Sequence, residues 1–477
     1  MPLIADPTCG AGSFLLAALD ELVEVGANSV EALERVRGVD LDSGAIDAAR
    51  VALFEWWRHR EGSVPTGERS VRAIIDRAVT VQDGFDLLEQ LSGCVDIIVG
   101  NPPFQNQLQS ASARSVTGRR SMQARFGEAA IGYVDDAALF LLAAVGHVAS
   151  GGVVTMIQPR STLAASHARG VRQSVLERGQ LIDLWIDDRN EFGASVSVCA
   201  PVISVGPSSV GPTMATTLHH GRVQLDSERR CPAPRSTDDS WSSCVASTHG
   251  VPKVELGTGS TIGDHSNVTA GFRDQYYGLV GHVSDARPSG AAARLITTGA
   301  IDIGGHGWGV RTQRFAKSSW TTPWVDVDAA RADTPALTSW FELMARPKVL
   351  VATQTRVAEA MADPMGDFVG ATPIIAAVPK DPSMVPSLAA VISSPPVAAW
   401  LAHRCAGSGM SRTSYRFRAS DIAAIVIPPD MPTWDEAVVA FEAHEWTRFA
   451  NLSCGAYGIA SASAVDVTRW WLDEIPD

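Results

Sequence analysis

Apolar and polar positions along the first two hundred residues predict short buried strands separated by amphipathic helices. Apolar runs of four to eight residues between turn formers are typical of strands in a parallel sheet, and apolar positions three and four residues apart are typical of helices. Strands are predicted at 3–6, 36–41, 79–82, 95–100, 152–158, 181–186 and 196–205, and helices at 14–25, 43–60, 136–149 and 162–178. This order predicts a doubly wound α/β domain with a mostly parallel sheet.

The pattern changes after residue 206, where a stretch rich in Gly, Pro and Ser predicts a linker at 206–212. Residues 213–430 combine short strands with many Gly, Ser, Thr and Trp residues, which predicts an irregular, β-rich module. Helical periodicity returns in 431–477 and predicts a helical tail. The expected domains are therefore 1–206, 213–430 and 431–477.

Composition narrows the class of protein. A chain of 477 residues exceeds what one core usually supports, and its net charge of −13 argues against a polybasic nucleic-acid coat. The charge does not exclude DNA binding, because the field that matters is local to a cleft. No apolar run reaches the roughly 18 residues of a membrane span, and no signal peptide is recognisable, so a cytoplasmic protein is expected. The seven cysteines lack metal-site spacing, so free thiols and no metal are expected.

The chain opens with a motif that is typical of a nucleoside-binding turn. Residues 6–14, Asp-Pro-Thr-Cys-Gly-Ala-Gly-Ser-Phe, join the first predicted strand to a helix through a Gly-x-Gly turn, whose bare backbone a ligand can approach. Asp40 ends the second predicted strand, where a carboxylate can accept two hydrogen bonds from a ribose diol. Asp83 ends the third and can accept from an adenine amino group, with Phe85 covering the ring. Helix capping is the alternative for both aspartates.

No sequence suited to holding a triphosphate is present. A nucleoside-bearing methyl donor therefore fits this motif better than ATP. The residues expected to bind the donor are Asp6, Pro7, Cys9, Gly10, Gly12, Phe14, Asp40, Leu41, Asp83 and Phe85.

A second motif, Asn101-Pro102-Pro103-Phe104, follows the buried strand predicted at 95–100. The carboxyl ends of strands are where open α/β sheets bind ligands. In this order, the two motifs resemble those of the S-adenosylmethionine-dependent N6-adenine DNA methyltransferases of the gamma arrangement, which occur in restriction-modification systems. Residues 151–161 and 191–198 are similar to later segments of that family's catalytic domain, and residues 346–351, 356–357, 407–412 and 421–429 to its target-recognition domain.

The resemblance implies a Rossmann-like methyltransferase sheet, S-adenosylmethionine as cofactor, and methyl transfer to N6 of an adenine flipped out of duplex DNA. The Asn101 side-chain oxygen and the Pro102 carbonyl would accept hydrogen bonds from the two N–H groups of the amino group, so that its lone pair points at the methyl group. Phe104 would stack on the base, with Phe192 on its other side. A plain turn is the alternative interpretation of this loop.

Arginine-rich segments carry the expectation of DNA binding. The polar insertion at 105–132 directly follows the acceptor motif, and a solvated loop is its alternative interpretation. Two further basic segments lie in the predicted second domain. The residues expected to contact DNA are Arg114, Arg119, Arg120, Arg346, Lys348, Arg356, Arg412 and Arg416.

Two other functions compete. A protein-glutamine methyltransferase would use a similar Asn-Pro-Pro-aromatic loop, but it would not need the large C-terminal module. A non-catalytic DNA-recognition subunit is the rival from another class. It is suggested by the short stretch before the first strand, because the family carries there a lid over the methionine end of the donor. The expectation is therefore a monomer that acts on double-stranded DNA, with a separate restriction or lid-supplying subunit as a further partner, in restriction-modification or phage defence.

Overall fold

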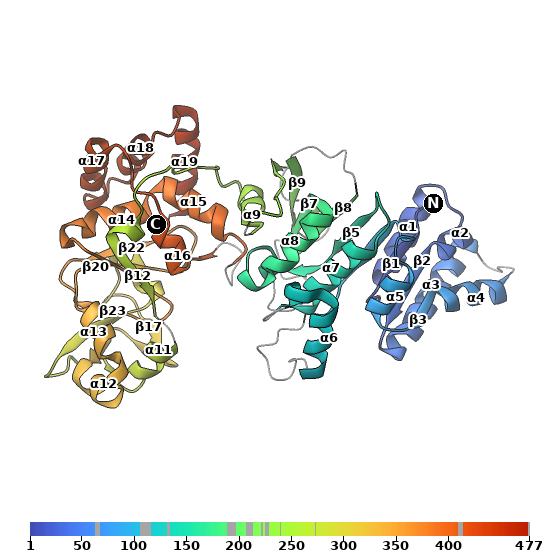
Figure 1. Ribbon diagram of the computed structural model, residues 1–477, viewed down its shortest axis with the longest axis horizontal. Helices are drawn as coiled ribbons and strands as arrows, with labels where there is room; N and C mark the ends of the chain where they lie inside the picture. Colours follow the sequence, from blue (N-terminus) through green and yellow to red (C-terminus); the bar gives the residue numbers. More distant parts are fainter. Residues whose placement is uncertain are drawn as a thin grey trace. The chain divides into compact units, whose positions relative to one another are not determined.

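The structure is a computed structural model that describes residues 1–62, 67–104, 116–130, 134–187, 197–206, 213–220, 223–224, 229–238, 240–271, 273–408 and 414–475, without the side chains of 116–119, 218–220, 223–224 and 229. The chain divides into two compact units, Met1–Thr248 and His249–Asp477. Figure 1 shows the helices and strands of both units. Each unit is described by itself.

Unit 1 is built on an eleven-stranded mixed sheet with the order β10-β9-β7-β8-β5-β4-β1-β2-β3, in which β11 also pairs with β9 and β6 with β8. The part from the edge strand β3 to β5 is parallel throughout, and β8 runs antiparallel to both β5 and β7. The strands are β1 (Ile4–Asp6), β2 (Val36–Asp40), β3 (Val79–Val81), β4 (Ile97–Gly100), β5 (Val153–Met156), β6 (Gln158–Pro159), β7 (Gly179–Asp187), β8 (Val198–Val205), β9 (Thr213–His220), β10 (Val223–Gln224) and β11 (Arg229–Pro232).

The helices of unit 1 follow the strands and bury their apolar stripes against the sheet. One core joins β1, β2 and β3 to buried residues of α1, α3 and α4, among them Leu19, Leu53 and Ile75. Helix α7 is buried along nearly its whole length, as its unbroken run of apolar residues predicts. The helices are α1 (Ser13–Glu24), α2 (Ser29–Glu34), α3 (Ser43–Glu61), α4 (Glu68–Ala78), α5 (Gly84–Gln90), α6 (Val116–Phe126), α7 (Asp136–His147), α8 (Arg169–Arg178) and α9 (Ser242–Thr248).

The α/β class predicted from the sequence is confirmed, and most predicted elements lie within a few residues of the observed ones. The domain boundary is different. Strand β9 pairs in parallel with β7 and so extends the first sheet beyond residue 206, and unit 1 continues to Thr248. The polar insertion at 105–132 also differs from a plain loop, because it contains α6.

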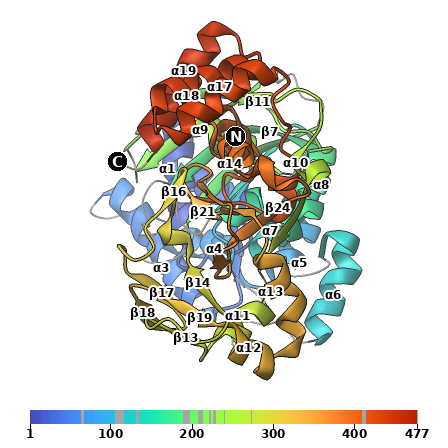
Figure 2. The same cartoon turned by 90° about the vertical axis from the view of Figure 1, so that its left-hand side faces the viewer.

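Unit 2 contains two four-stranded sheets, β12-β24-β20-β22 and β13-β19-β14-β23, and three two-stranded ribbons. Figure 2 shows its helices α17 to α19 at one end and the ribbon β17–β18 toward the other. The strands are β12 (Ser266–Ala270), β13 (Val283–Ser284), β14 (Ala292–Ile296), β15 (Ile301–Asp302), β16 (Gly305–His306), β17 (Gln313–Phe315), β18 (Ser318–Trp320), β19 (Trp324–Asp326), β20 (Lys348–Val351), β21 (Gln354–Thr355), β22 (Ala360–Asp363), β23 (Phe368–Gly370), β24 (Ile375–Pro379) and β25 (Tyr415–Arg416).

The helices of unit 2 lie mainly in its C-terminal half. The helical periodicity predicted for 431–477 is confirmed, and Trp434, Phe449 and Trp471 are fully buried there. The helices are α10 (Ile262–His265), α11 (Arg273–Leu279), α12 (Val327–Asp333), α13 (Thr338–Met344), α14 (Val385–Ser393), α15 (Pro395–Cys405), α16 (Ala419–Ala423), α17 (Met431–Glu442), α18 (Trp446–Ala456) and α19 (Ser461–Glu474).

In the part of the chain that the structure describes, no single helix is long and apolar enough to cross a membrane. The segments Pro382–Ser393 and Pro395–Cys405 reach that length only as a pair, which is bent by 60°. Most of their residues are buried within unit 2, as expected of core helices.

Candidate active site

The two sequence motifs lie at the same edge of the unit 1 sheet. Strand β1 pairs in parallel with β2 on one side and with β4 on the other. Parallel strands end at a common edge, so Asp6 at the end of β1, Asp40 at the end of β2 and Asn101 just beyond β4 lie along it. This is the edge at which ligand binding was expected.

The donor turn, residues 7–12 between β1 and α1, leaves its backbone accessible. Gly10 and Gly12 have φ angles of 52° and 88°, in the left-handed region that favours glycine. A Cβ added to Gly10 would meet no heavy atom within 4 Å, so the space beside it is open. Helix α1 starts directly after this turn, and among the described residues no side-chain cap bonds to its N-terminus. The positive end of the helix dipole is thus available to a polar ligand.

Two more glycines bring the donor turn against the neighbouring elements. A Cβ on Gly84, the first residue of α5, would lie 2.0 Å from the Pro7 carbonyl oxygen. A Cβ on Gly100 would lie 2.8 Å from Asp6 Oδ1. Neither glycine is among the predicted site residues. Their signal in the sequence is a glycine directly after Asp83 and another directly before Asn101.

Asp6 is a buried carboxyl group at the centre of this arrangement. It is 1% exposed, and its Oδ1 accepts a hydrogen bond of 2.9 Å from the Thr8 N–H. Burial raises the pKa of Asp6 to about 7, although the hydrogen bonds from Thr8 lower it. Within the described residues, Asp6 Oδ2 has no hydrogen-bond partner. A buried oxygen without a partner is costly, and such groups mark candidate sites.

Asp40 links the end of β2 to the donor turn. Its Oδ2 accepts from the Gly10 N–H and its Oδ1 from the Asp42 N–H, both at 3.0 Å. Helix α3 is capped instead by Asp42, which accepts from Gly44 and Ala45. The capping alternative is therefore wrong for Asp40. Its carboxylate orients the glycine turn and retains lone pairs for a further donor.

For Asp83 and Phe85 the structure favours a different interpretation. Asp83 caps α5 and accepts from the Phe85 N–H at 2.8 Å. The Phe85 ring is 6% exposed and stacks on Phe140, with 4.0 Å between ring centroids and 11° between planes. The prediction that Phe85 covers an adenine ring is therefore wrong, because its faces are used in the interior. Leu41, beside Asp40, is 73% exposed and is the available apolar side chain.

The acceptor loop, residues 101–104, presents a free amide beside a fixed backbone. The Gly100 carbonyl accepts from the Ile157 N–H at 3.0 Å, which fixes the end of β4. Pro102 is buried and Phe104 is half-buried, whereas Asn101 is exposed. No hydrogen bond joins the Asn101 side chain to another described residue. Phe192 lies outside the described residues.

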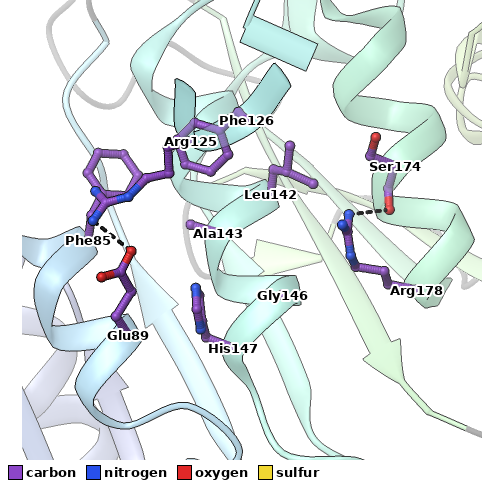
Figure 3. A pocket seen from close by; sticks show the side chains of 10 residues that line it. All are labelled: Phe85, Glu89, Arg125, Phe126, Leu142, Ala143, Gly146, His147, Ser174 and Arg178. Atoms are coloured by element: carbon purple, nitrogen blue, oxygen red, sulfur yellow. Dashed lines mark hydrogen bonds and ion pairs between the residues drawn. The ribbon is translucent and has the colours of Figure 1, made fainter. Parts of the chain in front are cut away.

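Beyond the acceptor loop, α6 is anchored to α5. The Arg125 guanidinium donates to Glu89 at 2.7 Å and lies 5.1 Å from the centroid of the Phe85 ring. A cavity of about 330 Å³ lies between α5, α6, α7 and α8, and its lining includes Phe85, Glu89 and Arg125 (Figure 3). Phe85 is the only predicted donor residue among the described residues that line it, so this cavity is distinct from the donor turn.

The predicted DNA-binding residues divide into exposed and buried ones. Lys348 is completely buried and forms an ion pair with Asp363, so the prediction that it contacts DNA is wrong. Arg114 and Arg412 lie outside the described residues, as does the side chain of Arg119. The predicted arginines that the structure describes as exposed are Arg120, Arg346, Arg356 and Arg416.

Comparison with protein families supports the resemblance seen in the motifs. Residues 34–190 match the family described as Eco57I restriction-modification methylase. This segment is similar to that family and includes Asp40, Asp83 and the acceptor loop, whereas the motif at residues 6–14 lies before it. The family resemblance predicted from the sequence is confirmed. No curated protein matches the chain.

Among solved structures, the chain is similar to MmeI, a Type IIL restriction-modification enzyme solved in complex with DNA. The two share 12% identity at a TM-score of 0.59, over 99% of this chain and 69% of MmeI. The Type IIG restriction endonuclease BpuSI matches with 11% identity and a TM-score of 0.40, over 100% of this chain and 63% of its own. The EcoKI M protein matches with 12% identity and a TM-score of 0.34, over 46% of this chain and 44% of its own. Of these three, only the likeness to MmeI has a TM-score high enough to indicate a shared fold.

Proposed function

We propose that this chain is a site-specific DNA methyltransferase that transfers a methyl group from S-adenosylmethionine to N6 of an adenine flipped out of duplex DNA. The observation that carries the proposal is the proximity of the donor turn to the end of β4, directly before the acceptor motif. Asp6, which directly precedes the donor turn, lies so close to Gly100 that a Cβ there would be 2.8 Å from its carboxylate oxygen. Donor and acceptor groups held at this edge would meet at short range.

The donor side fits S-adenosylmethionine. The open backbone at Gly10 admits a ligand close to the start of α1, and Asp40 is positioned to accept hydrogen bonds from a ribose diol. The exposed Leu41 supplies an apolar surface for the adenine ring of the donor. When bound, the donor supplies an electrophilic methyl group on a positively charged sulfur.

The acceptor side fits an exocyclic amino group. The nitrogen of such a group is a poor nucleophile, because its lone pair is delocalised into the ring. The Asn101 side-chain oxygen and the Pro102 carbonyl would accept hydrogen bonds from its two N–H groups. These bonds would turn the lone pair toward the methyl group. Phe104 would stack on the flipped base. Catalysis would then rest on alignment and on polar groups placed where charge develops.

Unit 2 is proposed to recognise the target sequence. A glutamine side chain poses the same chemical problem as adenine, but a protein methyltransferase has no evident use for a second unit of this size. Exposed Arg346, Arg356 and Arg416 give this unit cationic groups for DNA. Partner subunits and phage defence remain predictions.

The test is incubation of the chain with tritium-labelled S-adenosylmethionine and one of three substrates. These are a duplex DNA library, the same library synthesised with N6-methyladenine in place of adenine, and a glutamine-containing peptide. Label in the first substrate alone is expected. Label in the peptide would support the protein-glutamine alternative. Binding of the duplex without transfer of label would support the non-catalytic alternative.

A further inference from the structure

Unit 2 contains a cavity of about 480 Å³ that has no counterpart among the predicted sites. Its walls come from the ribbon β17–β18, from the segment 297–299 after β14, from Gln354 of β21 and from the loop 371–373. In both Figure 1 and Figure 2, the ribbon lies away from the end of the unit that holds α17 to α19.

The charge of this cavity is opposite to that of the chain. Arg314 and Lys317 line it, and none of the described lining residues is Asp or Glu. Both cations are exposed, and no ion pair with a described carboxylate engages either one. In a protein with a net charge of −13, two unpaired cations in a hollow without acid form a local positive field.

Hydrogen-bonding groups lie beside these cations in a fixed arrangement. Gln313 is 3% exposed, and its Oε1 accepts from the Thr297 N–H at 2.8 Å and from the Thr297 hydroxyl at 3.2 Å. These bonds fix the amide so that Nε2 is its free donor. Within the described residues, Gln313 Nε2 and the Thr298 hydroxyl both lack a partner. A buried donor without an acceptor at a cavity wall indicates that a ligand or water supplies one.

The turn that carries the second cation is also held in one conformation. Ala316 and Lys317 have φ angles of 50° and 66°, as in the two-residue turns that close antiparallel ribbons. The Phe315 ring packs against Tyr276, with 5.1 Å between centroids, and belongs to the core of unit 2. Lys317 is therefore presented on a rigid ribbon.

The cavity adjoins a segment that was already expected to meet DNA. Gln354, which lines the cavity, pairs directly with Arg416 in the ribbon β21–β25. The exposed Arg356 follows two residues later. Cations from three separate parts of the sequence thus lie on or beside one ribbon and one cavity.

We propose that this cavity holds the phosphodiester backbone of duplex DNA, with Arg314 and Lys317 as the cations that contact phosphate. The inference rests on the proposed function, since it concerns how the same protein holds its substrate. Phosphate suits the cavity because its free groups are cations and hydrogen-bond donors, with no carboxylate among its described lining residues to repel an anion. The Gln313 oxygen is already used by Thr297 and cannot complete an amide pair with an adenine edge. The contact would position the duplex without reading its sequence.

The test measures binding of the full chain to two unrelated duplexes between 50 and 200 mM salt. The variants are Arg314→Gln and Lys317→Asn, the second chosen because asparagine tolerates the left-handed conformation. Each is expected to reduce the slope of log affinity against log salt by about 0.9, so that the loss of affinity over this range becomes about 3.5-fold smaller. The control is Arg448→Gln on α18, an exposed arginine paired with Glu445, which should leave the slope unchanged.

The outcomes separate this inference from the proposed function. If the wild-type chain binds neither duplex, the proposed action on DNA fails. If the wild-type chain binds both, and both variants keep its slope while their melting temperatures are normal, the cavity does not hold phosphate. A variant that weakens one duplex but not the other would also overturn the inference, since it would indicate a base contact.

Discussion

Both units bury an ionisable side chain, and they differ in how completely its hydrogen-bonding groups are satisfied. In unit 2, the Lys348 ammonium contacts Asp363 and donates to the Met344 carbonyl at 2.5 Å. Asp363 also accepts from the N–H groups of Asp367 and Phe368 at 2.9 and 3.1 Å. In unit 1, Asp6 is equally buried, but one of its oxygens has no partner in the described chain.

The difference separates structure from function. A buried ion pair with every group satisfied holds its surroundings together, and burial keeps it from any ligand. A buried carboxyl group with an unused oxygen, placed between two loops that are proposed to bind ligands, costs stability and is expected at a site. Sequence alone presents Lys348 and Asp6 as similar candidates.

The largest expected effect comes from breaking the satisfied pair. Lys348→Met leaves Asp363 buried without a counter-charge and should lower the free energy of unfolding by about 3–5 kcal/mol. The double variant Lys348→Met, Asp363→Asn should recover part of this loss, because no charge remains buried and the amide oxygen still accepts from the backbone N–H groups there. Urea unfolding of the three proteins measures both values. A single variant as stable as the wild type would show that the pair is not structural.

Removal of the Asn101 side chain should have the opposite effect, with a loss of activity and no loss of stability. Asn101 is exposed and makes no hydrogen bond with another described residue, so Asn101→Ala should leave the melting temperature unchanged. Methyl transfer should fall by about 10²-fold or more, since a positioned acceptor at the reacting nitrogen is lost. Single-turnover transfer of labelled methyl groups measures this, with Asn267→Ala on β12 as the control. Normal turnover of Asn101→Ala would rule out the proposed mechanism.

Substitution of Asp40 should affect both stability and binding, because its carboxylate holds the donor turn and is also expected to bind ribose. Asp40→Ala should weaken S-adenosylmethionine binding by about 1.5–3 kcal/mol, the range for hydrogen bonds to charged groups. Calorimetric titration measures the affinity. Asp42→Ala is the matched control, since Asp42 caps α3 and its loss should lower stability without changing affinity. Equal losses of affinity in both variants would attribute the effect to the fold of this segment.

The last prediction concerns the pH dependence of stability, whose effect per pH unit is smaller than the effects above. The pKa of Asp6 is 3.8 when unperturbed and about 7 in the folded protein, so the folded state binds more protons between these values. Stability should therefore fall as pH rises through this window, by at most about 1.4 kcal/mol per pH unit. Asp6→Asn should flatten this slope. Urea unfolding at several pH values measures the slope.

Glu359 provides the comparison in unit 2. Burial raises its pKa to about 7 as well, so Glu359→Gln should flatten the slope by a similar amount. Its contribution is present in both the wild type and Asp6→Asn and cancels in their difference. Parallel pH profiles of wild type and Asp6→Asn would show that the Asp6 carboxyl group is ionised in the folded protein at all these pH values.

The sequence by itself determined the α/β class, most elements of unit 1 and the two loops of the candidate site. These features are local: a turn with two glycines, or an amide followed by two prolines, has its chemistry within a few consecutive residues. The parallel order of strands then places such loops at one edge without further information.

Only the tertiary structure decided which side chains remain available to a ligand. Phe85 and Lys348 carry the right chemical groups, but long-range packing buries one against Phe140 and the other against Asp363. The added strand β9 moved the unit boundary through pairing that no local pattern encodes. Arg314 and Lys317 line one cavity with Gln354, because the fold brings together segments that lie about forty residues apart in the sequence. Burial and pairing depend on contacts between distant residues, and periodicity does not specify those contacts.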